Sequence, residues 1–208
     1  KHYGSNFEVH ARFYPIVPLI NEYFYTGNEK YAYHGIRLVL DFAKKRPMVM
    51  YKDLQIGIQL TKITAAYLNL VDSPSMTPSA STGFLKHLLY DGNYLYDDKN
   101  FTSNMNYGMH ATQGYYALVL NFPEFKAHEM WREKVHERVL TLMNNLTHED
   151  GTYFESDFGY AMGSIGGFNT LMDYAKQDGW EIPDWYVERL RKLGIFLMNI
   201  TMPNGRIQ

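Results

Sequence analysis

The sequence predicts an all-α protein built as a stack of antiparallel helix hairpins. Hydrophobic residues recur at three- and four-residue spacing through about eight segments, which is the periodicity of a helix. Short breaks rich in Gly, Pro, Asp and Asn separate these segments, and none shows the strict alternation of a strand. The 208 residues are 46% hydrophobic and 20% charged, enough for a sizeable core. A toroid of hairpins and an open solenoid both fit this pattern.

The predicted helices follow one another along the whole chain. Their residue ranges are, in order, 6–25, 31–45, 53–71, 78–94, 103–121, 127–146, 156–177 and 183–199. Pro15 and Pro18 interrupt the first range, so that helix either begins near Pro15 or is kinked there. The second range is the clearest amphipathic helix, and Lys44 and Lys45 in its last turn suit the negative end of the helix dipole.

The breaks between these helices carry residues that end helices or form turns. Gly supplies the left-handed conformation of a helix stop, and Pro cannot continue a helix. The breaks are Thr26-Gly27-Asn28, Pro47, Asp72-Ser73-Pro74, a polar loop from Asp91 to Asn104, Phe122-Pro123, His148-Glu149-Asp150-Gly151 and Asp178-Gly179. We therefore expect helices of ordinary length joined by short loops.

The composition limits the classes of partner. A formal net charge of −2 gives no support for nucleic-acid binding, and no apolar run is long enough to span a membrane. Aromatic residues make up 16% of the chain, which suits a carbohydrate-binding cleft and a large aromatic core equally well. There is no cysteine, so the redox compartment stays open. The chain begins without Met and ends in a turn-like segment, and we expect it to be part of a longer protein.

The most informative stretch runs from residue 103 to residue 125. It begins with polar residues and ends with apolar ones, so we expect a helix with a polar N-terminal end and a buried body. The polar residues are Asn104, Asn106, Tyr107 and His110. Free N–H groups and a partial positive charge make a helix N-terminus suitable for an anionic ligand.

A second stretch, from Asp150 to Tyr160, reads as a turn, a short extended run and a helix start. Ser156 or Asp157 is expected to cap this helix. Tyr160 then lies in the first turn, close to whatever ligand the mouth of the fold holds.

No motif with a complete mechanism of its own occurs in the chain. There is no phosphate-binding loop, nucleophile elbow or metalloprotease motif. The eight histidines are scattered. His128 and His136 lie two turns apart on one predicted helix, too far for a shared metal ion, and we expect them to be solvated surface residues. We therefore predict no metal site in this chain.

Several blocks taken together resemble the heparinase II/III-like polysaccharide lyases, a superfamily that includes alginate and heparinoid lyases. The family pattern has an Asn-His-Gly start, an Ala- and Leu-rich helix and a Phe-Pro-Glu-Phe end. The matching residues here are Asn106-Tyr107-Gly108, Ala117-Leu118-Val119-Leu120, Phe122-Pro123-Glu124-Phe125 and Trp131.

Further blocks resemble the same family in the same order along the chain. They are Thr26-Gly27-Asn28-Glu29-Lys30-Tyr31, Leu54-Gln55-Ile56-Gly57-Ile58-Gln59-Leu60, Asp150-Gly151 with Phe154-Glu155 and Tyr160, and Pro203-Asn204-Gly205-Arg206. Each block is weakly specific, but the ordered set covers nearly the whole chain and is fairly specific.

The resemblance implies that residues 1–208 form a single, incomplete (α/α) toroid of antiparallel hairpins. In the family a β-sandwich follows, which this chain lacks and which could carry a structural metal, while no cofactor is expected here. The resemblance also implies a secreted or periplasmic enzyme that binds an anionic polysaccharide or oligosaccharide, with no nucleic-acid or membrane partner. The expected reaction is β-elimination at a 4-linked uronic acid.

The resemblance also implies roles for individual residues. Asn106 would hydrogen-bond the uronate carboxylate, and Tyr160 would take the C5 proton or protonate the leaving oxygen. A phenol has an ordinary pKa of about 10, so acting as a base needs a nearby cation or donor. His110, one turn after Asn106, would replace the family's missing imidazole. The expected substrate-binding residues are Tyr107, Asn6, His10, Gln59 and Glu155.

Three positions depart from the family pattern. Tyr107 and Ala161 stand where the family has histidine, and Gln59 stands where it has arginine. Two other functions therefore remain open. A glycoside hydrolase would need a carboxylate pair, for which Asp150, Glu155 and Asp157 are the clustered candidates. The other function is a non-catalytic glycan-binding helical module, which would need no carboxylate pair.

Overall fold

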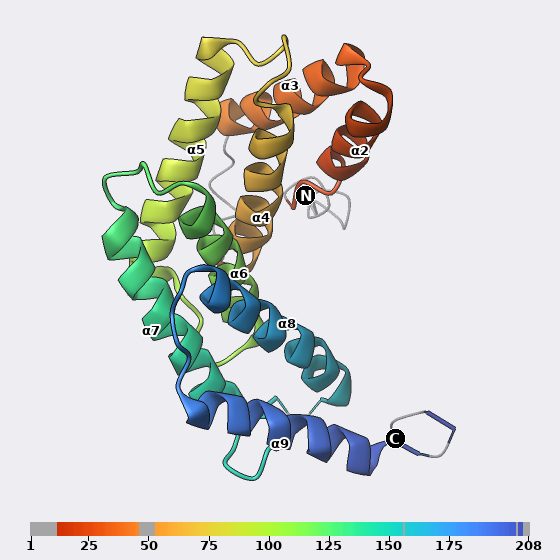
Figure 1. Cartoon of the computed structure of the whole chain (residues 1–208), viewed down its shortest axis with the longest axis vertical. Helices are drawn as coiled ribbons and strands as arrows, with labels where there is room; N and C mark the ends of the chain where they lie inside the picture. The colour runs from red at the N-terminus through yellow and green to blue at the C-terminus, as the bar shows by residue number, and fades with distance from the viewer. Residues whose placement is uncertain (1–11, 46–52, 156, 203, 206–208) are drawn as a thin grey trace, which may run out of the picture.

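The structure, a computed structural model, describes residues 12–45, 53–155, 157–202 and 204–205 (Figure 1). Within these residues the chain forms eight α-helices, one short 3-10 helix and an isolated β-bridge between Thr147 and Tyr153. The bounds are α2 Ile16–Thr26, α3 Glu29–Lys45, α4 Asp53–Leu70, α5 Pro78–Tyr96, η2 Asp98–Asn100, α6 Asn106–Asn121, α7 His128–Leu146, α8 Phe158–Gln177 and α9 Asp184–Ile200. None of the described helices is both long and apolar enough to cross a membrane.

The helix ends follow the predicted signals at most positions. Pro15 is the N-cap of α2, so the first helix begins just after it, and the predicted residues 6–11 lie outside the described part of the chain. Pro18 falls in the first turn of α2, where the backbone N–H has no partner within the helix, and so it does not break the helix. Gly27 ends α2 with a φ of 63°. Asp157 caps α8, as one of the two expected residues.

The helix predicted over 78–94 is confirmed and extends to Tyr96 as α5, so the predicted polar loop from Asp91 to Asn104, which overlaps that range, is wrong at its start. Asp91 is buried and lies 3.4 Å from the His87 imidazole one turn earlier, so its charge is accommodated inside the helix. Gly92 is buried as well, and a Cβ at this position would lie 2.7 Å from the Trp131 indole. Both residues look like loop formers in sequence, but close packing keeps them in the helix.

The helices form two layers. The even-numbered helices contact one another in the order α2, α4, α6 and α8, and the odd-numbered helices in the order α3, α5, α7 and α9. Each even-numbered helix also contacts the odd-numbered helix that follows it, which gives four hairpins. Figure 1 shows the hairpins arranged in an arc, with α5 and α7 along one side and α9 at the end. The predicted incomplete (α/α) toroid is confirmed.

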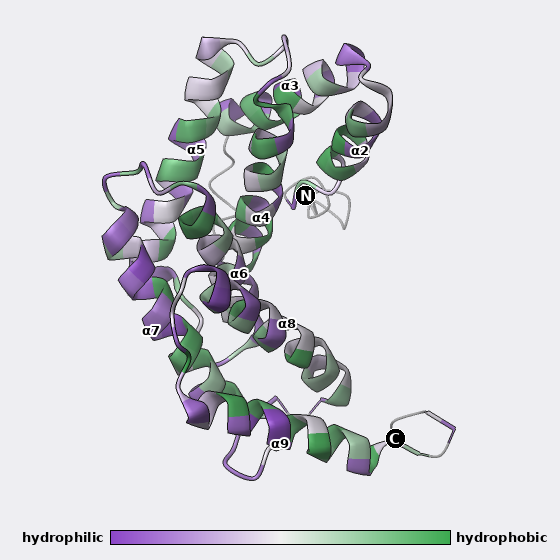
Figure 2. Cartoon of the chain, in the orientation of Figure 1, coloured by the Kyte–Doolittle hydropathy of each residue, from purple (hydrophilic) through white to green (hydrophobic). Residues whose placement is uncertain are grey.

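The two layers differ in how their helices are buried. In the inner helices α4 and α6 buried residues occur on most sides, including Gly57 and Gly114, whereas the outer helix α3 buries a single stripe. Figure 2 shows the matching hydropathy, with hydrophobic and hydrophilic residues alternating around the outer helix α9. The inner layer is therefore the centre of the core.

Helices α4 and α6 approach each other closely. A Cβ added to Gly114 would overlap the backbone carbonyl of Gly57, and one added to Gly57 would overlap the backbone of His110 and Ala111. Two helix backbones can come this close only where neither carries a side chain, so the two glycines set the spacing of the inner layer.

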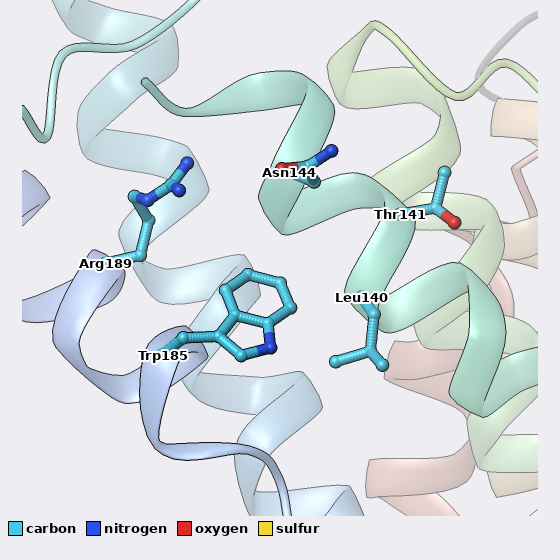
Figure 3. Close-up of a pocket in the computed structure, with 5 residues that line it drawn as sticks. All are labelled: Leu140, Thr141, Asn144, Trp185 and Arg189. Atoms are coloured by element: carbon cyan, nitrogen blue, oxygen red, sulfur yellow. The ribbon is translucent and has the colours of Figure 1, made fainter. Parts of the chain in front are cut away.

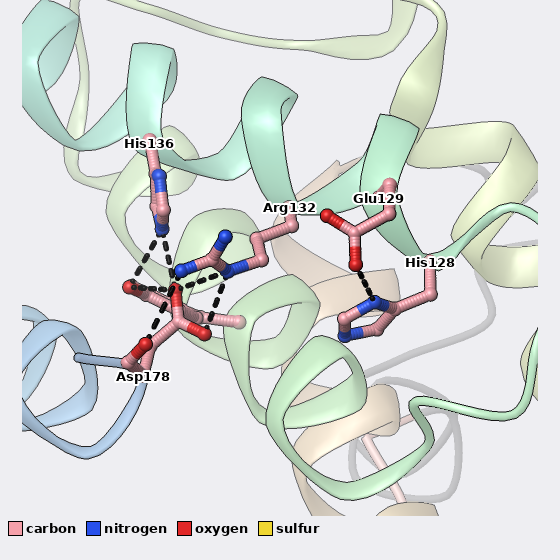
Figure 4. A network of polar contacts seen from close by, with 6 residues as sticks. His128, Glu129, Arg132, His136 and Asp178 are labelled. Atoms are coloured by element: carbon pink, nitrogen blue, oxygen red, sulfur yellow. Dashed lines mark hydrogen bonds and ion pairs between the residues drawn. The ribbon is translucent and has the colours of Figure 1, made fainter. Parts of the chain in front are cut away.

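A polar cluster closes the end of α8 (Figure 4). The Asp178 carboxylate accepts hydrogen bonds from Arg132 Nε at 2.8 and 2.9 Å and from the Tyr116 hydroxyl at 3.2 Å. His136 Nε2 lies 2.6 Å from the same carboxylate, and the imidazole stacks on Trp180 with 4.0 Å between ring centroids. Although burial acts to raise it, the pKa of Asp178 is lowered by hydrogen bonds from Arg132 and His136. The cluster joins α6, α7 and the turn after α8.

The expectation that His128 and His136 are solvated surface residues is wrong. The side chains of His136 and His128 are only 16% and 15% exposed, so neither is a solvated surface residue. Burial, together with the positive charge of Arg132, lowers the pKa of His136 against the opposing effect of Asp178. The error arose because the partners of His136 come from a segment about 40 residues away in the chain.

Replacing Gly114 with Ala should lower the free energy of unfolding by about 1–3 kcal/mol or more, because the new methyl group forces α4 and α6 apart. Urea denaturation followed by circular dichroism measures this. Gly163→Ala in α8 is the matched control, since its Cβ would meet no atom within 4 Å. The control should be neutral or slightly stabilising, and an equal loss in both variants would refute the role of the α4–α6 contact.

Replacing Asp178 with Asn should destabilise the protein by about 1–3 kcal/mol, because Arg132 and His136 lose a partly buried charged acceptor. The thermal unfolding midpoint at neutral pH reports the change. Glu188→Gln removes a carboxylate from the exposed ion pair with Arg191 and should have a much smaller effect. Equal shifts in the two variants would mean that the cluster contributes no more than a surface pair.

Candidate functional site

The start of α6 carries Asn106 in a first turn that has no side-chain cap. Asn106 is the first residue of the helix and is half-buried. Met105 before it has an extended backbone, with φ −142° and ψ 160°, and its side chain supplies no cap. The N–H of Gly108 is bonded to the Met105 carbonyl at 3.1 Å, so the N–H groups of Asn106 and Tyr107 are the ones that can bind an acceptor, and the helix dipole favours a negative one.

Two hydrogen bonds fix the segment that leads into α6. The buried carboxylate of Asp53, at the start of α4, accepts the backbone N–H of Thr102 at 2.7 Å. Asn145 of α7 donates its side-chain amide to the carbonyl of Ser103 at 3.3 Å. The position of Asn106 is thus set from both layers.

Arg138 of α7 holds the preceding 3-10 turn. Its side chain is only 2% exposed, and Nη2 donates to Asp98 Oδ1 at 3.1 Å. The guanidinium also lies over the Phe101 ring, 4.2 Å from its centroid. Hydrogen bonds from Arg138 and Lys134 lower the pKa of Asp98, so this carboxylate stays charged and the turn stays anchored.

The inner helices α6 and α8 run parallel, which places their N-terminal ends together. A Cβ on Gly167 would lie 2.6 Å from the sulfur of Met109, and farther along, Tyr116 and Tyr174 have ring centroids 5.8 Å apart. In both pairs the residue of α8 comes the same number of positions after the residue of α6. The two helices therefore stay aligned with each other along this length. With this alignment Tyr160 lies about one turn, or about 6 Å along the axis of α8, on the N-terminal side of the α8 residue that is level with Asn106.

Tyr160 is available to a ligand. Its side chain is 52% exposed, while its backbone N–H is held by Asp157 Oδ1 at 2.9 Å. Ala161, where the family has histidine, is buried, and it lines a pocket of about 280 Å³ between α8 and α9. Among the residues that the structure describes, no hydrogen bond joins Tyr160 to Asn106, so a bound ligand would have to bridge them.

His110 lies on the exposed side of α6, one turn after Asn106. Its pKa is lowered, first by displacement of water by the surrounding protein and then by the positive charge of Arg12, against a hydrogen bond with Gln113 that acts to raise it. The imidazole is therefore neutral at neutral pH. The positive charge of Arg12, before α2, is the smallest of these three effects.

The remaining predicted residues are placed differently. Tyr107 faces a pocket of about 360 Å³ whose other lining residues are Asp53, Tyr94, Lys99, Asn100, Phe101, Thr102 and Met105. Gln59 is 3% exposed inside α4. Glu155 accepts the Tyr153 hydroxyl at 2.9 Å. Asn6 and His10 lie outside the described residues. The helix register brings Asn106, His110 and Tyr160 to one end, and the substrate-binding roles of Gln59 and Glu155 stay predictions.

Sequence reasoning missed three residues that shape this end. Arg12 had no signal of its own. Asp53 looked like an ordinary first-turn acid. Arg138 could have been found, because it stands on the buried side of α7 between Val135 and Val139, where an unpaired arginine would be costly. In the described part of the chain no three His, Asp or Glu side chains gather as metal ligands.

The comparisons with known proteins identify the family of this chain. A family model described as Heparinase II/III N-terminus matches residues 9–207. A heparin-sulfate lyase of Pedobacter heparinus is 25% identical over 192 residues, which cover 88% of this chain and 29% of that protein. A heparin-sulfate lyase of Bacteroides stercoris is 24% identical over 213 residues, covering 90% and 32%. The chain thus spans about a third of the length of these relatives.

Solved structures show the same fold. A crystal structure of heparinase III aligns with a TM-score of 0.83 at 21% identity, over 93% of this chain and 31% of that one. The heparan sulfate lyase HepC from Pedobacter heparinus aligns with a TM-score of 0.76 at 23% identity, over 95% and 32%. The family match extends over nearly the entire sequence, and the chain belongs to the heparinase II/III N-terminal domain family.

Proposed function

We propose that this chain is the helical part of a polysaccharide lyase that cleaves a uronic-acid-containing polysaccharide by β-elimination. In this proposal Asn106 neutralises the substrate carboxylate and Tyr160 handles the proton. The observation that carries the proposal is the shared register of α6 and α8, which puts both residues at neighbouring helix starts in a member of a lyase family.

The uronate carboxylate is the first group that the site must bind. Its negative charge makes the C5 proton weakly acidic, so removing that proton needs groups that stabilise the enolate-like intermediate. The amide of Asn106 can donate to one carboxylate oxygen, and the uncapped first turn of α6 adds backbone donors and a favourable dipole. Arg12 supplies a positive charge nearby.

The proton and the leaving group are the second requirement. The phenol of Tyr160 takes the C5 proton or donates to the O4 leaving oxygen, according to the stereochemistry of the sugar. The C5–H bond electrons form the C4–C5 double bond as the C4–O4 bond breaks, and O4 takes a proton. His110, neutral at neutral pH, can accept or donate a hydrogen bond at the same end.

The substrate class follows from the site and from the relatives. Because two similar proteins are heparin-sulfate lyases, heparan sulfate is the first substrate to test, and alginate is the second. The mechanism above needs no cofactor within this chain. A polymeric anionic substrate also suits a secreted or periplasmic enzyme.

A glycoside hydrolase is less well supported, because the candidate carboxylates already have structural partners. Asp157 caps α8, and Glu155 accepts the Tyr153 hydroxyl. Asp150 accepts the backbone and side-chain donors of Thr152, which lower its pKa and make it a poor general acid. A non-catalytic glycan-binding module stays as the second candidate, favoured by the departures at Tyr107, Gln59 and Ala161.

The full-length protein should release products that absorb through the new C4–C5 double bond, and Tyr160→Phe should reduce this activity by about 100-fold or more. The fold should be retained, because the Tyr160 side chain is half-exposed. Tyr25→Phe, the same change at an exposed tyrosine of α2, is the control and should keep full activity. Binding without any unsaturated product would favour the module, and an active Tyr160→Phe variant would exclude the assigned role.

Replacing Asn106 with Ala should lower kcat and kcat/KM together by about 10²–10³-fold, because the lost hydrogen bond strengthens as charge develops. Initial rates over a range of glycan concentrations separate the two constants. Asn104→Ala, a change of the same type at an exposed neighbour, should leave both within about twofold. A rise in KM alone for the Asn106 variant would assign the residue to ground-state binding instead.

A further inference from the structure

The outer layer carries a surface pocket of its own, lined by none of the candidate site residues named above. It lies between α7 and α9 and has a volume of about 380 Å³ (Figure 3). Its lining residues are Leu140, Thr141, Asn144, Trp185 and Arg189. Asn106 and Tyr160 belong to α6 and α8 of the inner layer, so this pocket is a different site.

An exposed indole forms one wall of the pocket. Trp185 is 41% exposed, although tryptophan is usually well buried in a folded protein. Figure 3 shows its indole extending from α9 toward Leu140 of α7, with Arg189 one turn along α9. A flat apolar face beside hydrogen-bonding groups suits the apolar face of a sugar ring, as an aromatic side chain offers a wide contact at low entropic cost.

A fixed cation lies beside the indole. Arg189 is half-buried, and its Nη1 donates to the carbonyl of Thr147 at 2.9 Å, which sets the direction of the guanidinium. The other N–H groups remain to bind an anion. The neighbouring Glu188 is bound by Arg191 through two hydrogen bonds of 2.7 Å, so its charge is compensated.

The pocket also offers neutral polar groups. Within the described part of the chain, the side chains of Thr141 and Asn144 make no hydrogen bond, so a hydroxyl and an amide are available. Such groups can form hydrogen bonds with the hydroxyls of a sugar. A protein partner is a poorer fit, because a specific protein interface covers about 800 Å² per partner and has an apolar centre, whereas only Leu140 here is aliphatic.

We propose that this pocket binds an anionic glycan chain at a distance from the site of cleavage. Trp185 packs against a sugar ring, Arg189 binds a carboxylate or sulfate, and Thr141 and Asn144 bind hydroxyls. The choice of ligand rests on the proposed function, which supplies a uronate polymer long enough to reach a second site. The pocket would then hold the polymer while another part of it occupies the inner helix ends.

Affinity electrophoresis in gels that contain heparan sulfate tests the proposal on the full-length protein. All samples carry Tyr160→Phe so that the polymer is not cleaved during the run. Trp185→Ala should weaken retention by about threefold to tenfold, the effect of losing one aromatic contact. Asn144→Glu should weaken it too, by placing a negative charge in the pocket at an exposed position that the fold does not depend on. Circular dichroism checks that both variants fold.

Two controls on α9 separate the pocket from general effects. Arg191→Ala removes an exposed cation, and Met198→Ala removes an exposed apolar side chain, and both should keep parental retention. Unchanged retention of Trp185→Ala and Asn144→Glu, or equal losses in the controls, would overturn the proposal, as would a parent that is not retained. Absence of unsaturated product from the protein with Tyr160 intact, combined with Trp185-dependent retention of the Tyr160→Phe parent, would refute the lyase assignment and leave the glycan site standing.

Discussion

The contact between Gly57 and Gly114 determines how the inner layer is built. Because neither residue has a side chain, the backbones of α4 and α6 approach to a distance that no other residue would allow. Helix α6 also packs on α7 and α8, so its position relative to α4 is passed on to the second half of the arc. A larger spacing here would move the start of α6 away from the start of α4, where Asp53 holds the segment that leads to Asn106.

The candidate site depends on residues that do not belong to it. Asn106, His110 and Tyr160 lie on inner helices, but the segment before α6 is held by Arg138 and Asn145 of the outer layer. A buried arginine that binds a carboxylate and lies against an aromatic ring has few alternative positions, so the segment is fixed before any ligand arrives. This arrangement leaves the exposed face of Tyr160 and the uncapped turn of α6 free for binding.

Most of the fold could be predicted because its signals are local. Helical periodicity, Gly27 as a helix stop and Asp157 as a cap are all read within a few residues. The errors occurred where a distant partner decides the outcome. The loop predicted from Asp91 fails because Trp131 packs on Gly92, and His136 is buried because Asp178 and Trp180, in the turn after α8, lie against it. The candidate residues Asn106 and Tyr160 come from local sequence blocks and stay predictions, whereas the distant contacts through which Arg138 and Asn145 hold the segment before α6 could not be predicted.

The layered arrangement has a consequence for how the chain acquires its structure. Among the described helices, pairs with extensive contact are never more than two positions apart in the chain order. Contacts that are local in sequence close small loops and cost little entropy, so such topologies fold quickly. Each hairpin leaving the ribosome can therefore dock on the one before it, and the arc can grow during synthesis from α2 toward α9 without waiting for the C-terminal residues.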